Sequence, residues 1–176
     1  MRFGWRHLRS VLLLPFVVTV VVPMLLVLPL RSLAIGWPVS SPLQWLLRLI
    51  GVAALFGGLR LVVQTVRLFA HVGEGTLAPW DPPQKLVLQG PYRYVRNPMI
   101  SGVMAILVGE TAIIGSVSLL MWAIGFIIVN MIFIPVFEEP QLLKRFGADY
   151  QQYRLHVPRW LPRRTPWDVM PELSQQ

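Results

Sequence analysis

The sequence predicts an all-α integral membrane protein with about four transmembrane helices, a helical hairpin at its core and a cytoplasmic amphipathic helix near its C-terminus. Hydrophobic residues make up 55% of the 176 residues and charged residues only 14%, which leaves too little polar surface to cover a water-soluble globule. Four long apolar segments are visible, and basic residues gather at their ends. We divide the chain into residues 1–70, with the N-terminal transmembrane helices, and residues 71–176, with a loop, the hairpin and a tail.

The first apolar segment, residues 11–30, has about the twenty residues that cross a bilayer. Its three prolines predict a kink. Three arginines that precede it also fit the basic start of a cleaved signal peptide. The apolar stretch is longer than the usual signal core of about 7–15 residues, so we favour an uncleaved helix.

The second segment, about residues 42–70, is apolar at its centre and carries a Gly57–Gly58 pair, which allows a neighbouring helix to approach closely. Arg60, Gln64 and Arg67 are three to four residues apart and therefore share one helix face. Two interpretations stay open. These side chains snorkel towards the membrane interface, or they contact a ligand.

The third and fourth segments, residues 98–114 and 119–137, are separated by only four residues. We therefore expect a tight antiparallel hairpin whose two outer ends lie at the same membrane face. The loop before it, residues 71–97, is rich in glycine and proline, which favour turns.

Polar residues gather at these outer ends. The segment Gly90–Pro98, Gly-Pro-Tyr-Arg-Tyr-Val-Arg-Asn-Pro, leads into the third helix, and Glu138–Glu139, the acidic pair, ends the fourth. Polar side chains at such depth persist mostly where they serve a function, and opposite charges at one face indicate a site for a zwitterionic ligand. The alternatives are topological flanking charge for the arginines and favourable helix-terminal charge for the glutamates.

The distribution of basic residues predicts the orientation. The N-terminus, the 71–97 loop and the tail are basic, whereas the turn between the third and fourth helices has no charge, so both termini and the polar motifs are expected to be cytoplasmic. The net charge of +8 sits at helix ends, which indicates anionic lipid rather than nucleic acid as its partner. The chain has no cysteine and three scattered histidines, so we expect no metal site.

The tail is predicted to continue as an amphipathic helix over residues 138–155. Its apolar and aromatic positions are Leu142, Leu143, Phe146, Tyr150 and Tyr153. Trp160 and Trp167 lie among arginines and are interpreted as anchors at the membrane interface.

At these residues the chain resembles the isoprenylcysteine carboxyl methyltransferase family, including its bacterial members, and more distantly the phospholipid methyltransferases. Five ordered segments carry the resemblance: Gly73–Pro83, Gly90–Pro98, Glu138–Leu142, Phe146–Tyr153 and Val157–Arg159. Many members have histidine where Asn97 stands and tyrosine where Ile100 stands.

The resemblance implies methyl transfer from S-adenosylmethionine to a lipophilic acceptor with a carboxylate or amine head group, in the bacterial inner membrane, with residues 71–176 as the methyltransferase-like core. The cofactor's ammonium and sulfonium suit carboxylates, its carboxylate suits arginines and Asn97, and tyrosines pack on its adenine or near its sulfonium. The expected cofactor-binding residues are Tyr92, Arg93, Tyr94, Arg96, Asn97, Pro98, Glu138, Glu139 and His156. Glu139 and Arg154 are the expected catalytic residues, and Arg159 is a second candidate to neutralise a carboxylate acceptor.

Two other functions compete with this one. Membrane reductases of the sterol-reductase type, which use NADPH, also carry Arg-Tyr and Arg-x-Pro elements, but the acidic pair disfavours a phosphorylated nicotinamide cofactor. A non-enzymatic helical membrane subunit would have polar residues along a path across the bilayer, whereas here they gather at one face. The expected partners are membrane lipids and a lipid or other lipophilic substrate, without nucleic acid, and the sequence predicts no oligomeric state.

Overall fold

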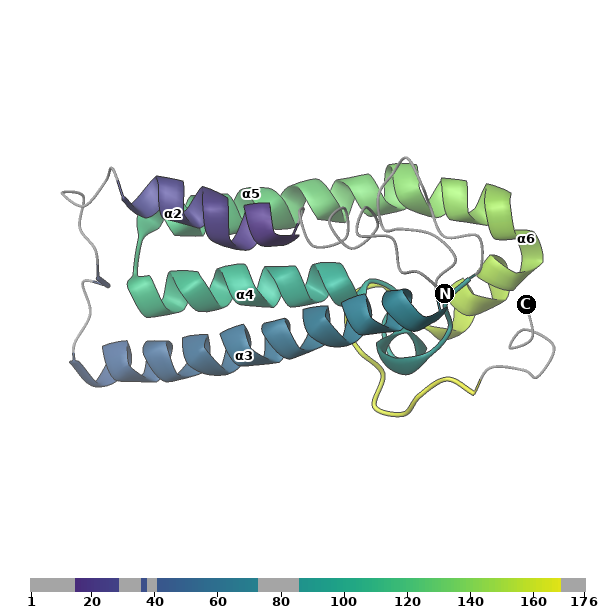
Figure 1. Cartoon of the computed structure of the whole chain (residues 1–176), viewed down its shortest axis with the longest axis horizontal. Coiled ribbons are helices and arrows are strands. Elements are labelled where there is room, and N and C mark those ends of the chain that lie inside the picture. Colours follow the sequence, from purple (N-terminus) through teal and green to yellow (C-terminus); the bar gives the residue numbers. More distant parts are fainter. Residues whose placement is uncertain (1–14, 29–35, 38–40, 73–85, 169–176) are drawn as a thin grey trace.

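The structure is a computed structural model that describes residues 15–28, 36–37, 41–72 and 86–168. Within them the chain is helical, with no β-strand. The elements in order are η1 (Val17–Val21), α2 (Val22–Val27), α3 (Ser41–Val72), η2 (Gly90–Arg93), α4 (Pro98–Ile114), α5 (Val117–Phe133), η3 (Ile134–Glu138) and α6 (Glu139–His156). Helices α3, α4 and α5 lie along the long axis of the molecule, with α2 beside α5 and α6 at one end (Figure 1).

The hairpin forms as the sequence predicts. Helix α4 covers the predicted 98–114, with Pro98 in its first turn and Gly115 as a left-handed cap at φ 72°, the positions that favour these two residues. Only Gly115 and Ser116 separate α4 from α5, so the turn is shorter than the predicted four residues. Helix α5 continues through η3 into α6 without a break, so α6 has no free N-terminus.

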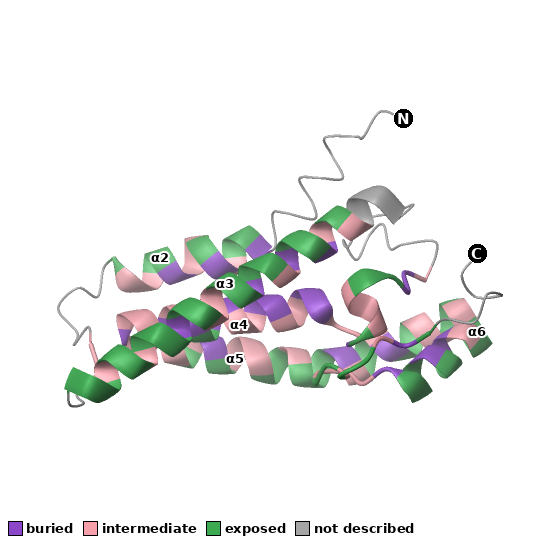
Figure 2. Cartoon of the chain, turned by 90° about the horizontal axis from the view of Figure 1, so that it is seen from below, coloured by how far each residue is buried: buried purple, intermediate pink, exposed green. Residues whose placement is uncertain are grey.

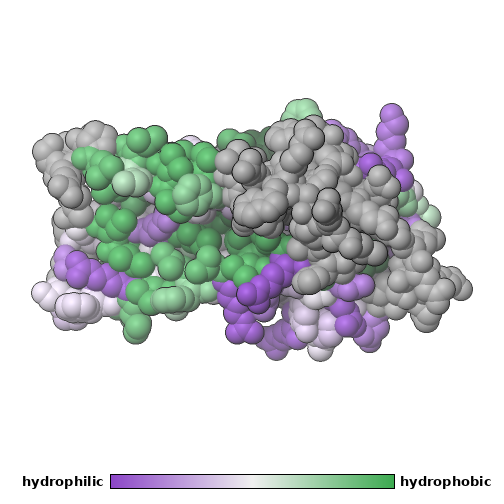
Figure 3. Space-filling model, in the orientation of Figure 1, coloured by the Kyte–Doolittle hydropathy of each residue, from purple (hydrophilic) through white to green (hydrophobic). Residues whose placement is uncertain are grey.

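Among the described residues, two helices are long and apolar enough to cross a membrane, Ser41–Leu68 and the continuous run Val117–His156. Only 17% of the most apolar window of each is buried, which is unlike the core helix of a soluble protein. Exposed residues run along α3 (Figure 2), and much of the visible surface along the helices is apolar (Figure 3). Helices Val17–Val27 and Pro98–Ile114 are apolar but shorter, so the count of four spans stays a prediction. The remainder of the predicted first span lies outside the described residues.

Two pairs of glycines join α3 to α4, and this is the most extensive contact between helices in the described part of the chain. A Cβ on Gly58 would lie 2.5 Å from the carbonyl oxygen of Gly102, and one on Gly102 would lie 2.9 Å from that of Gly58. Gly51 and Gly109 oppose each other in the same way, at 2.9 and 2.7 Å. The two backbones thus approach too closely for any side chain, as in small-residue packing between membrane helices.

The tail packs on α6 through the Trp167 cluster, which comprises Leu88, Tyr150, Tyr153, Val157 and Trp167. The other predicted apolar positions of α6 border this cluster. Trp167 is 7% exposed, so its interpretation as an interfacial anchor is wrong, because the tail folds back and buries the indole. Gly147 has non-helical angles, φ 53° and ψ −125°, which divide α6 at a kink that the sequence pattern did not predict.

We expect Gly58→Ala to destabilise the protein by about 1–3 kcal/mol, because the added methyl would overlap the carbonyl of Gly102 in a close-packed interface. The midpoint of thermal unfolding in detergent would measure the loss. Gly57→Ala is the matched control, since a Cβ there meets nothing within 4 Å. Equal midpoints for the two variants would show that close approach at Gly58 does not support the fold.

Candidate functional site

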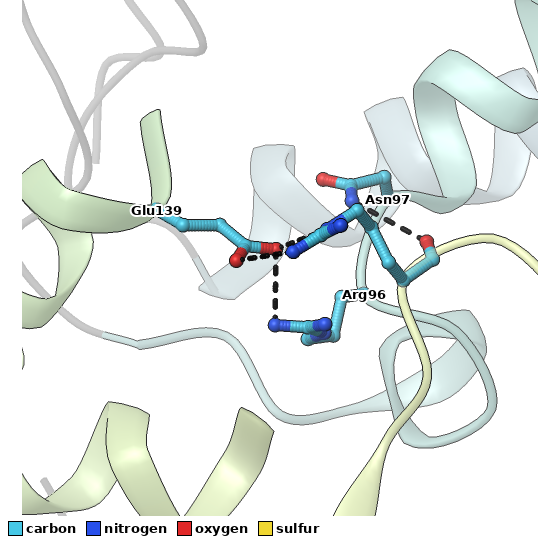
Figure 4. A network of polar contacts seen from close by, with 4 residues as sticks. Arg96, Asn97 and Glu139 are labelled. Carbon is cyan, nitrogen blue, oxygen red and sulfur yellow. Dashed lines mark hydrogen bonds and ion pairs between the residues drawn. The ribbon is translucent and has the colours of Figure 1, made fainter. Parts of the chain in front are cut away.

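The centre of the candidate site is a buried carboxylate held by two guanidinium groups, here called the Glu139 cluster. Glu139 is 3% exposed. Arg159 donates from Nε to its Oε1 at 2.6 Å and from Nη2 to its Oε2 at 2.8 Å, and Arg96 Nη1 lies 3.0 Å from Oε1 (Figure 4). The forked contact from Arg159 is the strong, directional form of this ion pair.

Backbone hydrogen bonds place the two arginines. The residues before α4 run antiparallel to the tail, since Arg96 N–H donates to the Pro158 carbonyl at 2.9 Å and Arg163 N–H donates to the Tyr94 carbonyl at 3.0 Å. Asn97 Nδ2 donates to the Arg159 carbonyl at 3.3 Å. The approach to α4, the start of α6 and the tail therefore meet at Glu139, as expected for the segment 90–98 and the acidic pair.

The cluster keeps Glu139 ionised. Burial raises the pKa of its carboxyl, but the hydrogen bond from Arg159 and the charge of Arg96 outweigh burial and hold the pKa below its usual value. The charge of Arg154 acts in the same direction. Two guanidinium groups facing one carboxylate leave one positive charge in excess. The Arg96 side chain is 9% exposed, and its Nε is buried without a hydrogen-bond partner among the described residues.

Glu138 has the opposite environment. Burial, and secondarily the charge of Glu139, raise the pKa of its carboxyl above the usual value. The Glu138 carboxyl makes no hydrogen bond or ion pair with another side chain among the described residues. Its charge also helps to raise the pKa of Tyr92, after the larger effect of burial. Adjacent carboxyls with pKa values shifted in opposite directions are typical of functional sites.

The tyrosines next to the cluster remain protonated. Burial, followed by the charge of Glu139, raises the pKa of Tyr150 to about 12, and burial also raises the pKa of Tyr153. The Tyr153 hydroxyl donates to the Tyr92 carbonyl at 2.8 Å. Neither phenol therefore supplies a base near neutral pH, and Tyr153 instead fixes the backbone of the segment that carries Arg96.

Other predicted site residues lie further from the cluster. Arg93 fastens the tail, donating from Nε to the Trp167 carbonyl at 2.8 Å and from Nη2 to Asp168 at 2.7 Å. Pro98 is buried in the first turn of α4, and Arg154 is exposed. His156 is exposed, donates from Nδ1 to the Gln152 carbonyl at 2.8 Å, and stacks on Trp167 with ring centroids 5.2 Å apart. The functional roles expected of these residues stay predictions.

A pocket of about 900 Å³ borders the site, here called the arginine pocket. It shares no residue with the Glu139 cluster. Its lining residues are Arg60, Leu61, Gln64, Arg67, Leu68, Gly90, Pro91, Arg93, Tyr94, Val95, Ser101, Trp160, Pro162 and Pro166. Arg93 and Tyr94, which were predicted to bind the cofactor, thus face a different space from Arg96.

Sequence reasoning missed the main role of Arg159, which is to clamp Glu139. The residue belongs to the Val157–Arg159 motif, but its partner lies 20 positions earlier, and no helical or strand spacing relates the two. Ser101 in the arginine pocket was also missed, because nothing in its local sequence distinguishes it, and Trp160, interpreted as an interfacial anchor, lines the same pocket.

The comparisons with known proteins give one result. The family model described as phospholipid methyltransferase matches residues 46–149, more than half of the chain. The match begins within α3 and ends within α6, so it reaches further toward the N-terminus than the motifs of the loop and hairpin. No curated protein and no solved structure matches the chain. The match crosses the division at residue 70, and the two-part organisation stays a prediction.

The two glutamates of the acidic pair yield opposite predictions for the stability of their glutamine variants. A lowered pKa means that Glu139 adds stability above its unfolded pKa of about 4.3, and that this stability is lost as pH falls through the folded value. Glu139→Gln should therefore cost about 3 kcal/mol at pH 7, because it leaves two arginines without their carboxylate, and the deficit should shrink below pH of about 4.

Glu138→Gln is the matched control. A raised pKa means that ionised Glu138 destabilises the folded state at neutral pH, so this variant should be as stable as the native protein or more so. Unfolding in detergent at several pH values measures both effects. Equal losses for the two variants at pH 7 would contradict the assignment of opposite environments.

Proposed function

The chain belongs to the phospholipid methyltransferase family, and on that premise we propose that it is a membrane enzyme that transfers a methyl group from S-adenosylmethionine to a lipophilic acceptor beside the Glu139 cluster. The observation that carries this proposal is the arrangement of charge at the cluster. Arg96 has a buried donor without a described partner, and Glu138, next to Glu139 in the chain, has a carboxyl outside any described ion pair. Such a pair of opposite charges suits the carboxylate and ammonium of an amino-acid group.

The residues present fit this cofactor. Arg96 and Asn97 would hold its carboxylate, Glu138 its ammonium, and Tyr92 would pack beside it. When bound, S-adenosylmethionine supplies a methyl group on a positively charged sulfur, which is open to direct displacement by an acceptor oxygen or nitrogen. The chain's own contribution would then be to align the two reactants and exclude water, which can supply much of a rate enhancement.

Glu139 would act as a positioning residue in this arrangement. Both of its oxygens accept hydrogen bonds from Arg159, and Arg96 lies at ion-pair distance. The carboxylate thereby fixes the direction in which Arg96 presents its Nε donor. Direct contact between Glu139 and the cofactor, and the roles of Arg154 and His156, remain parts of the proposal that substitution must test.

We further propose that the site faces the cytoplasm and that the acceptor reaches it from the bilayer. The spanning part of α3 exposes apolar side chains along its length, and the site lies where the apolar run of α5 ends. The family match does not favour the alternatives of an NADPH-dependent reductase or a non-enzymatic membrane subunit.

Isothermal titration calorimetry on the purified protein tests the cofactor. We expect saturable binding of S-adenosylhomocysteine, which keeps the carboxylate and ammonium, and no binding of NADPH. Glu138→Gln should weaken the affinity by about tenfold, the value of one charge-assisted hydrogen bond.

Asp149→Asn, which removes one negative charge from α6, is the control and should leave the affinity unchanged. Binding of NADPH without S-adenosylhomocysteine would replace the proposal with the reductase. Equal weakening by the two variants would assign the effect of Glu138 to net charge rather than to contact.

Acceptor entry from the bilayer predicts a dependence on chain length. Each additional buried CH₂ contributes about 0.8 kcal/mol, so methylation at a fixed head group should rise several-fold per carbon until the tail of about ten or more carbons is accommodated. The dependence is measured as the methylation rate of acceptors that differ only in acyl-chain length, in detergent micelles that the acceptor does not saturate. Equally efficient methylation of a short, water-soluble analogue would rule out entry from the membrane.

A further inference from the structure

The arginine pocket has a charge that the proposed methyl transfer does not use. Three guanidinium groups, those of Arg60, Arg67 and Arg93, are among the described residues that line it, and no aspartate or glutamate is among them. S-adenosylmethionine carries two cationic groups against one carboxylate, so this lining would repel it. The pocket therefore suits a different ligand, and one with negative charge.

Two of these arginines have no competing partner among the described residues. Arg60 and Arg67 are exposed and make no ion pair or hydrogen bond there. Hydrophilic surface interrupts the apolar surface over this part of α3 (Figure 3). The third arginine, Arg93, pairs with Asp168, but that carboxylate is 95% exposed, and such surface pairs hold little free energy.

A second and independent observation concerns the wall formed by α4. Ser101 lines the pocket, and its hydroxyl oxygen is buried without a hydrogen-bond partner among the described residues. A buried hydroxyl that lacks a partner costs free energy. Ser101 lies in the first turn of α4, where the helix dipole favours an anion. Snorkelling accounts for exposed arginines at a helix end, but it does not account for this hydroxyl.

We propose that the arginine pocket binds the phosphate of an anionic phospholipid head group that is not the methyl acceptor. Guanidinium groups pair with phosphate through parallel hydrogen bonds, and the hydroxyl of Ser101 adds a neutral donor. A lipid is favoured over a soluble anion because the same lining includes Leu61, Leu68 and Trp160, and because α3 continues from the pocket into its apolar span. Basic pockets beside membrane helices commonly recognise anionic head groups.

Dioleoyl phosphatidylglycerol is the probe, because it carries a phosphate but neither the amine nor the carboxylate of the expected acceptor head groups. Native mass spectrometry of the full chain in a maltoside detergent, without cofactor, measures its binding. Each of Arg60→Gln and Arg67→Gln should weaken the affinity by about fivefold, and the double variant by about 25-fold.

Arg48→Gln is the matched control, since Arg48 lies at the other end of α3, where its guanidinium stands 5.4 Å from the ring centroid of Trp45. It should leave the affinity unchanged. The double variant with lysines at 60 and 67 keeps the charge but loses the forked geometry, and should bind with intermediate affinity. Unchanged unfolding midpoints confirm that the variants are folded.

Three results would overturn the proposal. Equal weakening by Arg48→Gln would indicate nonspecific attraction to the basic surface. Displacement of the lipid by inorganic phosphate at comparable concentration would indicate a site for a soluble anion. Tighter binding of phosphatidylethanolamine than of phosphatidylglycerol would indicate an acceptor head-group site. Because no cofactor is present, failure of the S-adenosylmethionine proposal would leave this result unaffected.

Discussion

The candidate site depends on the ion pair between one buried carboxylate and two arginines. Glu139 connects three segments that are distant in sequence, which are the approach to α4, the start of α6 and the tail. Burying such a group is costly, and removing one partner leaves an uncompensated charge. The cluster is therefore better understood as a device that fixes geometry than as a net source of stability. It holds Arg96 in front of α4, with the Nε of that guanidinium still without a hydrogen-bond partner among the described residues.

The helix packing beneath the site is equally constrained. The glycine pairs bring the backbones of α3 and α4 together with no side chain between them, and Gly102 is only one turn beyond the start of α4. A displacement of α3 would therefore move the first turn of α4 and the Arg96 segment in front of it. The same contact leaves no space between α3 and α4 at Gly58. An acceptor that comes from the bilayer therefore cannot pass between the two helices at this position.

The features that sequence reasoning predicted are those with local physical signals. Helix α4 was predicted to its end residues from its apolar run, and the proline in its first turn and the glycine of its left-handed cap fit those ends. The short polar turn between α4 and α5 predicted the hairpin, and the hairpin placed Arg96 beside Glu139. The contact of Arg159 with Glu139 and the burial of Trp167 were not predicted, because the fold-back of the tail uses backbone hydrogen bonds, which leave no side-chain pattern. The kink at Gly147 depends on a positive φ. A glycine permits this angle, but its presence in the sequence does not predict it.

Two arginines of one motif, only three residues apart in sequence, lie in different surroundings. Arg96 turns towards the acidic pair, whereas Arg93 lines the arginine pocket and ties down the tail. The segment between them thus separates a site that contains carboxylates from a pocket whose described lining residues include none. The guanidinium groups of the arginine pocket would repel a ligand that carries ammonium and sulfonium groups, so the two spaces suit different ligands. The net charge of +8 need not act only on membrane topology, because its placement around this segment can sort two ligands of opposite charge at one membrane face.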